Sequence, residues 1–218
     1  MRRPCPARGT ERYRAPGVDS PQIEYRLTKC PELCLGVFCT VVPEEAKDFD
    51  LATLRMAKPV ETDRENGAVS VLLAQIISTR SNANVVTDAD MGYPKDWKSA
   101  PGKASDVGHQ EGGRSVAIHS LAVAPKLQGC GLGKLIIKSY VQQINNSGTA
   151  DRVTLICQDV RNCFACLLDG CCTNRHQYLV TYYQRFGFQH LGESKAQFGG
   201  GGWHDMVFHL EVPHTNVC

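Results

Sequence analysis

Long hydrophobic runs and a strong charge of either sign are both missing from this sequence of 218 residues. A membrane-spanning helix needs about 18 or more consecutive apolar residues, and no such stretch occurs. The formal net charge is only +2 at pH 7, which gives no general argument for binding nucleic acid or a membrane surface. We therefore expect neither nucleic acid nor a membrane as a partner. Hydrophobic residues make up 42% of the chain, enough for a packed core.

A secretory signal is also missing, because the first residues contain no apolar stretch. Residues 1–21 are basic and rich in proline and arginine, and we expect them to form a disordered tail. The acidic Glu11 and the prolines disfavour an organelle-targeting leader. The eleven cysteines are accordingly interpreted as reduced thiols of a cytoplasmic protein. Cys34, Cys39 and Cys157 lie in apolar runs, where cysteine acts as a small hydrophobic residue.

Short apolar runs that alternate with amphipathic stretches predict a mixed α/β domain. The polar residues 80–113 are predicted to be a flexible loop, and the charged residues 43–67 an exposed excursion. The expected strands cover 33–42, 68–79, 114–123, 152–157 and 204–212, with a further strand starting at 187, and the expected helices cover 131–146 and 178–186.

The segment from Gln128 to Gly133 joins a predicted strand to a predicted helix and contains three glycines. The first turn of a helix has backbone N–H groups without partners and carries a partial positive charge. Glycines keep side chains away from those groups, so this turn suits an anion such as a pyrophosphate. An ordinary tight turn explains the glycines about equally well. No Gly-Lys-Ser/Thr sequence follows and the turn lies mid-chain, which disfavours a Walker or Rossmann nucleotide site.

Four further motifs accompany this turn: CPELCLG at 30–36, HSLAV at 119–123, YYQRFGF at 182–188 and FGGGGWHDMVFHL at 198–210. The glycine turn resembles the acetyl-CoA pyrophosphate loop of the GNAT acyltransferase superfamily. The other motifs resemble its serotonin (arylalkylamine) N-acetyltransferases, the last one their fungal-type members. The resemblance implies one acetyltransferase domain over residues 22–213, with a mixed, mostly antiparallel central sheet flanked by helices.

The resemblance also implies the catalytic residues. Tyr183 matches the tyrosine that acts as general acid beside the CoA sulfur, and a phenol is a competent donor to a departing thiolate. His119 matches one of two histidines, spaced two apart on one strand, that relay the substrate proton through water. The position of the other histidine is Ala117. The alternative for Tyr183 is a core aromatic, and the alternative for His119 is a hydrogen-bonded structural residue.

Acetyl-CoA is the co-substrate that the resemblance implies. The backbone at Leu121 and Val123 is expected to run beside its pantetheine arm, and the N–H groups of Gly129 to Lys134 to bind its pyrophosphate. The expected cofactor-binding residues are Leu121, Ala122, Val123, Gln128, Gly129, Cys130, Gly131, Leu132, Gly133 and Lys134.

The amine substrate has fewer candidate contacts. Pro31 belongs to a family loop that closes over the aromatic amine, and Leu121 is a further candidate. Trp203 and Phe198 are candidate pocket walls, although a tryptophan flanked by glycines also suits the anchor of a hairpin. No metal is expected as a cofactor.

Two departures from the family pattern stand out. The CPELCLG motif starts at Cys30, so the strand and helix that precede it in the family are expected to be truncated, and an incomplete gene model is one explanation. Residues 160–177 are an atypical insertion, and an unspliced intron read in frame is one interpretation, since 18 codons preserve the frame. A zinc site is the other interpretation, although adjacent cysteines hinder tetrahedral closure; its ligands would come from Cys163, Cys166, Cys171, Cys172 and His176.

The leading hypothesis is an acetyl-CoA-dependent N-acetyltransferase that acts on the primary amine of an arylalkylamine such as serotonin or tryptamine. A polyamine is the alternative substrate, and an acidic groove would favour it. A catalytically impaired paralogue that binds acyl-CoA is the alternative from another functional class, supported by Ala117 and the short N-terminal part. The sequence leaves the oligomeric state undecided.

Overall fold

The structure, a computed structural model, describes residues 20–45, 59–100, 102–158 and 179–211. The predicted tail, up to residue 19, and the insertion at 160–177 lie outside these ranges, so those predictions stay untested. Among the described helices, none has the length and apolar character needed to cross a membrane.

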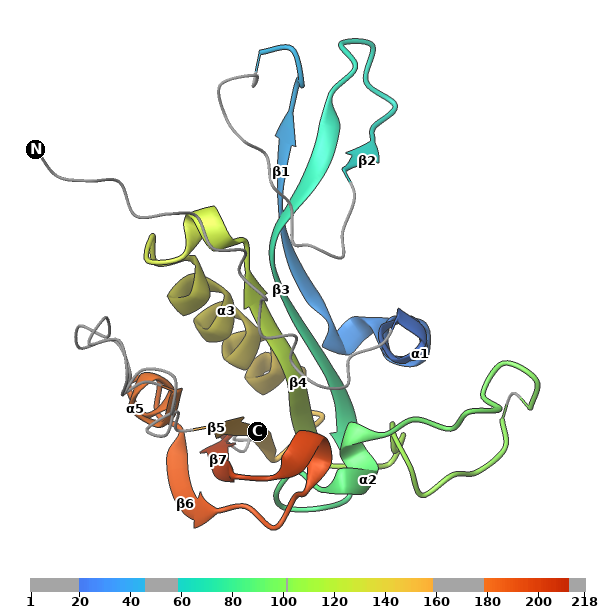
Figure 1. Cartoon of the computed structure of the whole chain (residues 1–218), viewed down its shortest axis with the longest axis vertical. Coiled ribbons are helices and arrows are strands. Elements are labelled where there is room, and N and C mark those ends of the chain that lie inside the picture. The colour runs from blue at the N-terminus through green and yellow to red at the C-terminus, as the bar shows by residue number, and fades with distance from the viewer. Residues whose placement is uncertain (1–19, 46–58, 101, 159–178, 212–218) are drawn as a thin grey trace, which may run out of the picture.

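One seven-stranded sheet forms the centre of the molecule, in the order β1-β3-β4-β5-β7-β6, with β2 paired to β3 (Figure 1). All neighbouring strands are antiparallel except β4 and β5, which are parallel. The predicted mixed, mostly antiparallel sheet is therefore confirmed. The strands are β1 (Leu35–Val41), β2 (Val60–Glu61), β3 (Val69–Ser81), β4 (Ser115–Val123), β5 (Arg152–Gln158), β6 (Gln189–Glu193) and β7 (Trp203–His209).

The main core lies between the sheet and helix α3 (Leu132–Ser147), with helix α5 (Leu179–Gln184) beside it. The apolar residues that recur at helical spacing along α3 are buried there, as the sequence predicts; they are Ile136, Ile137, Tyr140 and Ile144. The Tyr140 hydroxyl donates to the Leu33 carbonyl at 2.9 Å, which fixes α3 to the turn before β1. Figure 1 shows α3 and α5 on one side of the strands and the other helices on the opposite side.

The N-terminal part contains a helix where the sequence analysis expects only a tail and a truncated element. Helix α1 (Ser20–Lys29) packs beside β3 and buries Tyr25 and Arg26. The Cys30 thiol after it donates to the Ser78 carbonyl of β3 at 3.3 Å. Residues 20–29 therefore form a helix that the sequence analysis did not predict, while the truncation of the preceding strand and helix stays a prediction.

The polar stretch at 80–113 differs from the predicted flexible loop. Strand β3 continues to Ser81, and a short helix α2 (Asp88–Met91) follows. A reciprocal capping box closes the start of α2: the Thr87 side chain accepts from the Asp90 N–H while the Asp90 carboxylate accepts from the Thr87 N–H. Helix α2 buries Asp90 and Met91, so this part of the stretch belongs to the packed structure.

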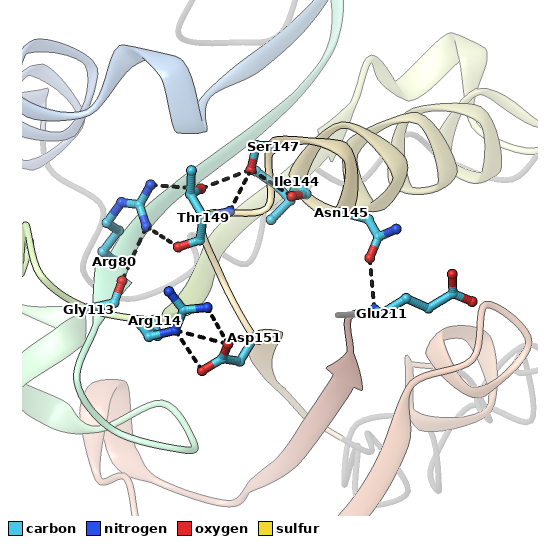
Figure 2. A network of polar contacts seen from close by, with 9 residues as sticks. All are labelled: Arg80, Gly113, Arg114, Ile144, Asn145, Ser147, Thr149, Asp151 and Glu211. Atoms are coloured by element: carbon cyan, nitrogen blue, oxygen red, sulfur yellow. Dashed lines mark hydrogen bonds and ion pairs between the residues drawn. The ribbon is translucent and has the colours of Figure 1, made fainter. Parts of the chain in front are cut away.

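A polar network fastens the far end of α3 to the sheet (Figure 2). The Arg80 guanidinium of β3 donates to the Gly113 carbonyl at 3.2 Å and to the Thr149 carbonyl at 2.8 Å. On the other side, the Asn145 side-chain oxygen accepts from the Glu211 N–H at 2.8 Å. These contacts fix the C-terminal end of α3 to β3 and to the residues after β7.

Candidate active site

Strands β4 and β5 pair only over their first halves. The parallel register joins Ser115–Ile118 of β4 to Arg152–Leu155 of β5 and extends no further. Beyond it, β4 continues to pair with β3 up to Val123. The backbone groups of β4 that point away from β3 therefore lie along a gap between two diverging strands, where an extended ligand can add hydrogen bonds as a strand would. Leu121 and Val123, expected beside the pantetheine arm, lie on this edge.

His119 marks the point at which the two strands separate. The β3 neighbours Ile77 and Ser78 pair with Ser120 and Ile118, respectively. His119 between them has no register partner and forms a β-bulge, which bends the strand and changes the direction of the side chain.

The glycine turn lies at the open end of this gap. Gly129 and Gly131 have φ values of 86° and 83°, the left-handed region that side chains other than glycine rarely adopt. Gly131 is the N-cap of α3 and no side chain caps the helix, so its first N–H groups face outward. A Cβ added at either glycine would meet no atom within 4 Å, which leaves room for an anion. The Gln128 amide donates to the Val123 carbonyl at 3.3 Å and ties the turn to β4.

The two tyrosines of YYQRFGF lie in different surroundings. Tyr183 is 8% exposed, packs against Phe188 in the main core, and lies near Cys157 of β5. Burial raises the pKa of Tyr183 well above its ordinary value, and the Cys157 thiol adds to this. Tyr182 is half-buried, and its hydroxyl would lie 2.7 Å from a Cβ on Gly133, so the glycine lets this phenol approach the first turn of α3. Tyr182 is thus the tyrosine against the glycine turn, and Tyr183 the one against β5.

The imidazole of His119 faces the opposite side of the sheet. Its Nε2 lies 2.7 Å from the Thr79 Oγ1 of β3, and its Nδ1 lies 3.4 Å from the Met91 Sδ of α2. Burial lowers the pKa of His119 well below its ordinary value of 6.5, and the Arg26 guanidinium lowers it further. The imidazole is therefore neutral at pH 7 and able to accept a proton.

The sheet separates the two predicted catalytic groups. Tyr183 belongs to the core cluster on the α3 side, whereas the Met91 that contacts His119 belongs to a second cluster with Val86 and Ala117. Tyr183 is thus a candidate proton donor on the α3 side of the sheet, and His119, where β4 parts from β5, is a candidate proton acceptor on the other side. A donor and an acceptor of this kind suit general acid–base chemistry.

Comparison with known proteins points to one enzyme family. The acetyltransferase (GNAT) family model matches residues 102–188, from the segment before β4 to the residue before β6, which is less than half of the chain. The fold is that of the GNAT acetyltransferases. This supports an N-acetyltransferase that uses an acyl-CoA as co-substrate.

Individual relatives are distant. The serotonin N-acetyltransferase of Mesocricetus auratus is 26% identical over 91 residues, 42% of this chain and 35% of the hamster protein, so the match spans about a third of that relative. The NatC complex bound to Gag peptide and CoA shares 15% identity over 86% of this chain and 77% of its own, with a TM-score of 0.44. The GNAT-like decarboxylase GphF in complex with isobutyryl-CoA shares 9% sequence identity over 80% of this chain and 100% of its own, with a TM-score of 0.43.

The predicted amine contacts are dispersed over the fold. Pro31 is exposed at the start of the 3₁₀ turn Pro31–Leu33. The Trp203 indole N–H donates to the Phe198 carbonyl at 2.6 Å, so Trp203 anchors the loop between β6 and β7. Phe198 itself packs against the cluster of Met91 and Ala117, on the face to which His119 points. Of the two candidate pocket walls, Phe198 is thus the one that the structure places beside the His119 side of the gap.

Two residues beside His119 escape the sequence analysis. Thr79 and Met91 lie 40 and 28 positions away from it in the chain, and nothing in the local sequence indicates that they meet. The capping pattern of Thr87 and Asp90 is a signal that the sequence does contain, and it marks the start of α2. Recognising that pattern would have predicted an ordered helix inside the polar stretch.

Three cavities in the described part of the chain are lined by residues away from the gap. One of them, about 310 Å³, lies between α3 and the end of β7, and Val141, Phe186 and Phe208 contribute to its lining. The hypothetical zinc ligands at 163–176 fall outside the described ranges. Within those ranges, no group of three or more histidine, cysteine, aspartate or glutamate side chains is arranged to hold a metal.

Proposed function

We propose that this protein transfers the acetyl group of acetyl-CoA to the primary amine of an arylalkylamine of the serotonin or tryptamine kind. The separation of β4 from β5 supports this proposal, together with the position of Tyr183 on the α3 side of the sheet, that of His119 on the other side, and the uncapped N-terminus of α3. The residues fit a CoA ligand: the uncapped α3 terminus suits its phosphates, and the free edge of β4 suits its extended amide arm.

The roles of the two side chains follow from their protonation states. His119, neutral at pH 7, takes up the proton that the amine must lose as it attacks the thioester carbonyl. Tyr183, protonated throughout the neutral range, donates its hydroxyl proton to the sulfur as the carbon–sulfur bond breaks. One carbon–nitrogen bond forms, one carbon–sulfur bond breaks, and an N-acetylamine and free CoA result.

An arylalkylamine suits the His119 side of the gap better than a polyamine does. The side chains that gather there are apolar: Met91, Phe198 and Ile156 belong to one cluster. Two of the nearby carboxylates are already used, since Asp90 closes the capping box and Asp88 accepts from the Gln197 and Phe198 N–H groups. Asp205, the register partner of Ile156, is the exception: its buried Oδ1 has no hydrogen-bond partner in the described part of the chain, so it offers one carboxylate to an ammonium group. A polyamine needs carboxylates that are free to pair with its ammonium groups, whereas an aromatic ring needs apolar contacts.

Thiol release by the purified full-length protein tests the proposal. Protein whose unfolding temperature rises with CoA is supplied with acetyl-CoA and either tryptamine or spermine, and released CoA thiol is measured against a sample without amine. Turnover with tryptamine and little with spermine is the expected result. Preferred turnover of spermine would favour the polyamine alternative, and stabilisation by CoA without thiol release would favour an impaired paralogue.

The pH dependence of kcat tests the role of His119. Because its pKa lies well below 6.5, we expect the acidic limb of the kcat profile to lie below that value, with activity at its plateau by pH 7. His119→Gln should lower kcat by about 10²-fold and remove this limb. An unchanged acidic limb of the kcat profile in this variant would contradict the assignment.

The free energy of unfolding should depend on the same imidazole. The unfolded chain takes up a proton near pH 6.5 that the folded chain does not, so unfolding becomes easier as the pH falls below 6.5.

A further inference from the structure

His119 has a different partner at each ring nitrogen, and these partners restrict its tautomer. A neutral imidazole carries one hydrogen, on either Nδ1 or Nε2, and the other nitrogen then accepts. Thr79 lies at Nε2 at 2.7 Å and Met91 at Nδ1 at 3.4 Å. The chemistry of these two side chains decides which nitrogen carries the hydrogen.

Met91 favours a hydrogen on Nδ1. A thioether sulfur accepts hydrogen bonds weakly and has no hydrogen to donate. With the hydrogen on Nδ1, the contact of His119 with the sulfur is a weak hydrogen bond. With the hydrogen on Nε2, the lone pair of Nδ1 would face the lone pairs of the sulfur at the same 3.4 Å.

Thr79 favours the same tautomer independently. Its side chain is 0% exposed, and a buried hydroxyl needs an acceptor for its hydrogen. In the described part of the chain, the Thr79 hydroxyl has His119 as its hydrogen-bond partner. The hydroxyl therefore donates to Nε2, and this requires that Nε2 carry no hydrogen.

We propose that Thr79 and Met91 are positioning residues that hold His119 as the neutral Nδ1–H tautomer, so that Nε2 is the nitrogen that takes up a proton. Once Nε2 is protonated, a rotation of the Thr79 hydroxyl makes its oxygen the acceptor, and Met91 still accepts from Nδ1–H. Both N–H groups of the imidazolium then have acceptors, while the Thr79 hydrogen loses the acceptor it had in the resting state, which disfavours the protonated form until the proton is passed on.

The surrounding elements hold both partners in place. Thr79 is the register partner of Ala117, which brings its side chain to the face of His119. Met91 is held from α1, because the Arg26 guanidinium donates to its carbonyl at 2.9 Å and the Gln22 amide donates to the same atom. The backbone of Met91 is thereby held by contacts between segments that are far apart in the chain, and its buried side chain lies opposite Nδ1.

The tautomer is measurable by NMR on the resting protein. The ring nitrogen shifts of protein labelled with ¹⁵N-histidine distinguish a protonated from an unprotonated nitrogen, and the signals that His119→Gln removes belong to His119. At pH 7 we expect one species with hydrogen on Nδ1 alone. A hydrogen on Nε2, an even mixture or an imidazolium would overturn the proposal. The role of His119 as a base rests on the proposed function, whereas its tautomer is measured without substrate. The tautomer assignment can therefore fail while the proposed function holds, and the reverse.

A double variant tests the positioning residues themselves. Thr79→Val with Met91→Leu removes both hydrogen-bonding groups and keeps similar shapes, and Thr154→Val with Met206→Leu makes the same changes at buried positions elsewhere in the sheet. We expect the Thr79→Val/Met91→Leu variant to populate both tautomers of His119 and to lower kcat about tenfold, with the KM for acetyl-CoA unchanged. The Thr154→Val/Met206→Leu variant should leave the His119 spectrum unchanged. If the Thr79→Val/Met91→Leu variant gave the wild-type spectrum, the positioning role would be refuted. If that variant did not fold, the tautomer observed in the natural protein would decide the proposal.

Discussion

Tyr183→Phe is expected to lower kcat by about 10²-fold or more while CoA still binds. The change removes only the hydroxyl, and the ring retains its contact with Phe188, whose centroid lies 5.6 Å away. Because burial keeps the pKa of Tyr183 well above its ordinary value, the phenol stays protonated and no alkaline limb from it should occur below about pH 10. Steady-state kinetics with tryptamine, together with calorimetry of CoA binding, measures both quantities.

Tyr182→Phe is the matched control for this prediction. The two tyrosines are adjacent on α5, their rings lie 5.3 Å apart, and each variant removes one hydroxyl. Tyr182 lies against Gly133 at the glycine turn, so its variant should affect CoA affinity more than kcat. If Tyr182→Phe abolishes turnover and Tyr183→Phe retains it, the general acid is Tyr182 and our assignment is wrong.

Gly131→Val is expected to weaken CoA binding by about 10- to 100-fold. A β-branched residue at φ 83° is strained, and its side chain would occupy the open space in front of the first N–H groups of α3. A loss of about 1.4 kcal/mol for each tenfold change in affinity follows if those N–H groups bind the phosphates. Isothermal titration calorimetry with CoA gives the dissociation constant directly.

Gly67→Val separates backbone strain from ligand binding. Gly67 has φ 66° in the turn before β3, and a Cβ there would also meet no atom within 4 Å. Both variants should therefore lose stability, but Gly67→Val should bind CoA as the natural sequence does. Equal CoA affinities in the two variants would show that the glycine turn is only a tight connection between β4 and α3.

Much of the fold is predictable because the signals are local. The expected strands and the helix after the glycine turn agree with the structure to within a few residues, since their apolar residues recur at the periods of strands and helices. The short helix α2 was missed because it is brief and lies within a polar stretch, and it is ordered by its cap and by contacts with distant segments. Helix α1 was missed for a similar reason: its burial depends on β3.

The candidate site divides in the same way. The sequence alone predicted the glycine turn and singled out His119, Tyr183 and the alanine at position 117 as candidate site positions, because each belongs to a short continuous motif. Only the tertiary structure decided that β4 bulges at His119 and separates from β5, and that Thr79 and Met91 meet the two nitrogens of the imidazole. These features depend on strand register and on packing between residues far apart in the chain, and no local pattern of residues encodes either one.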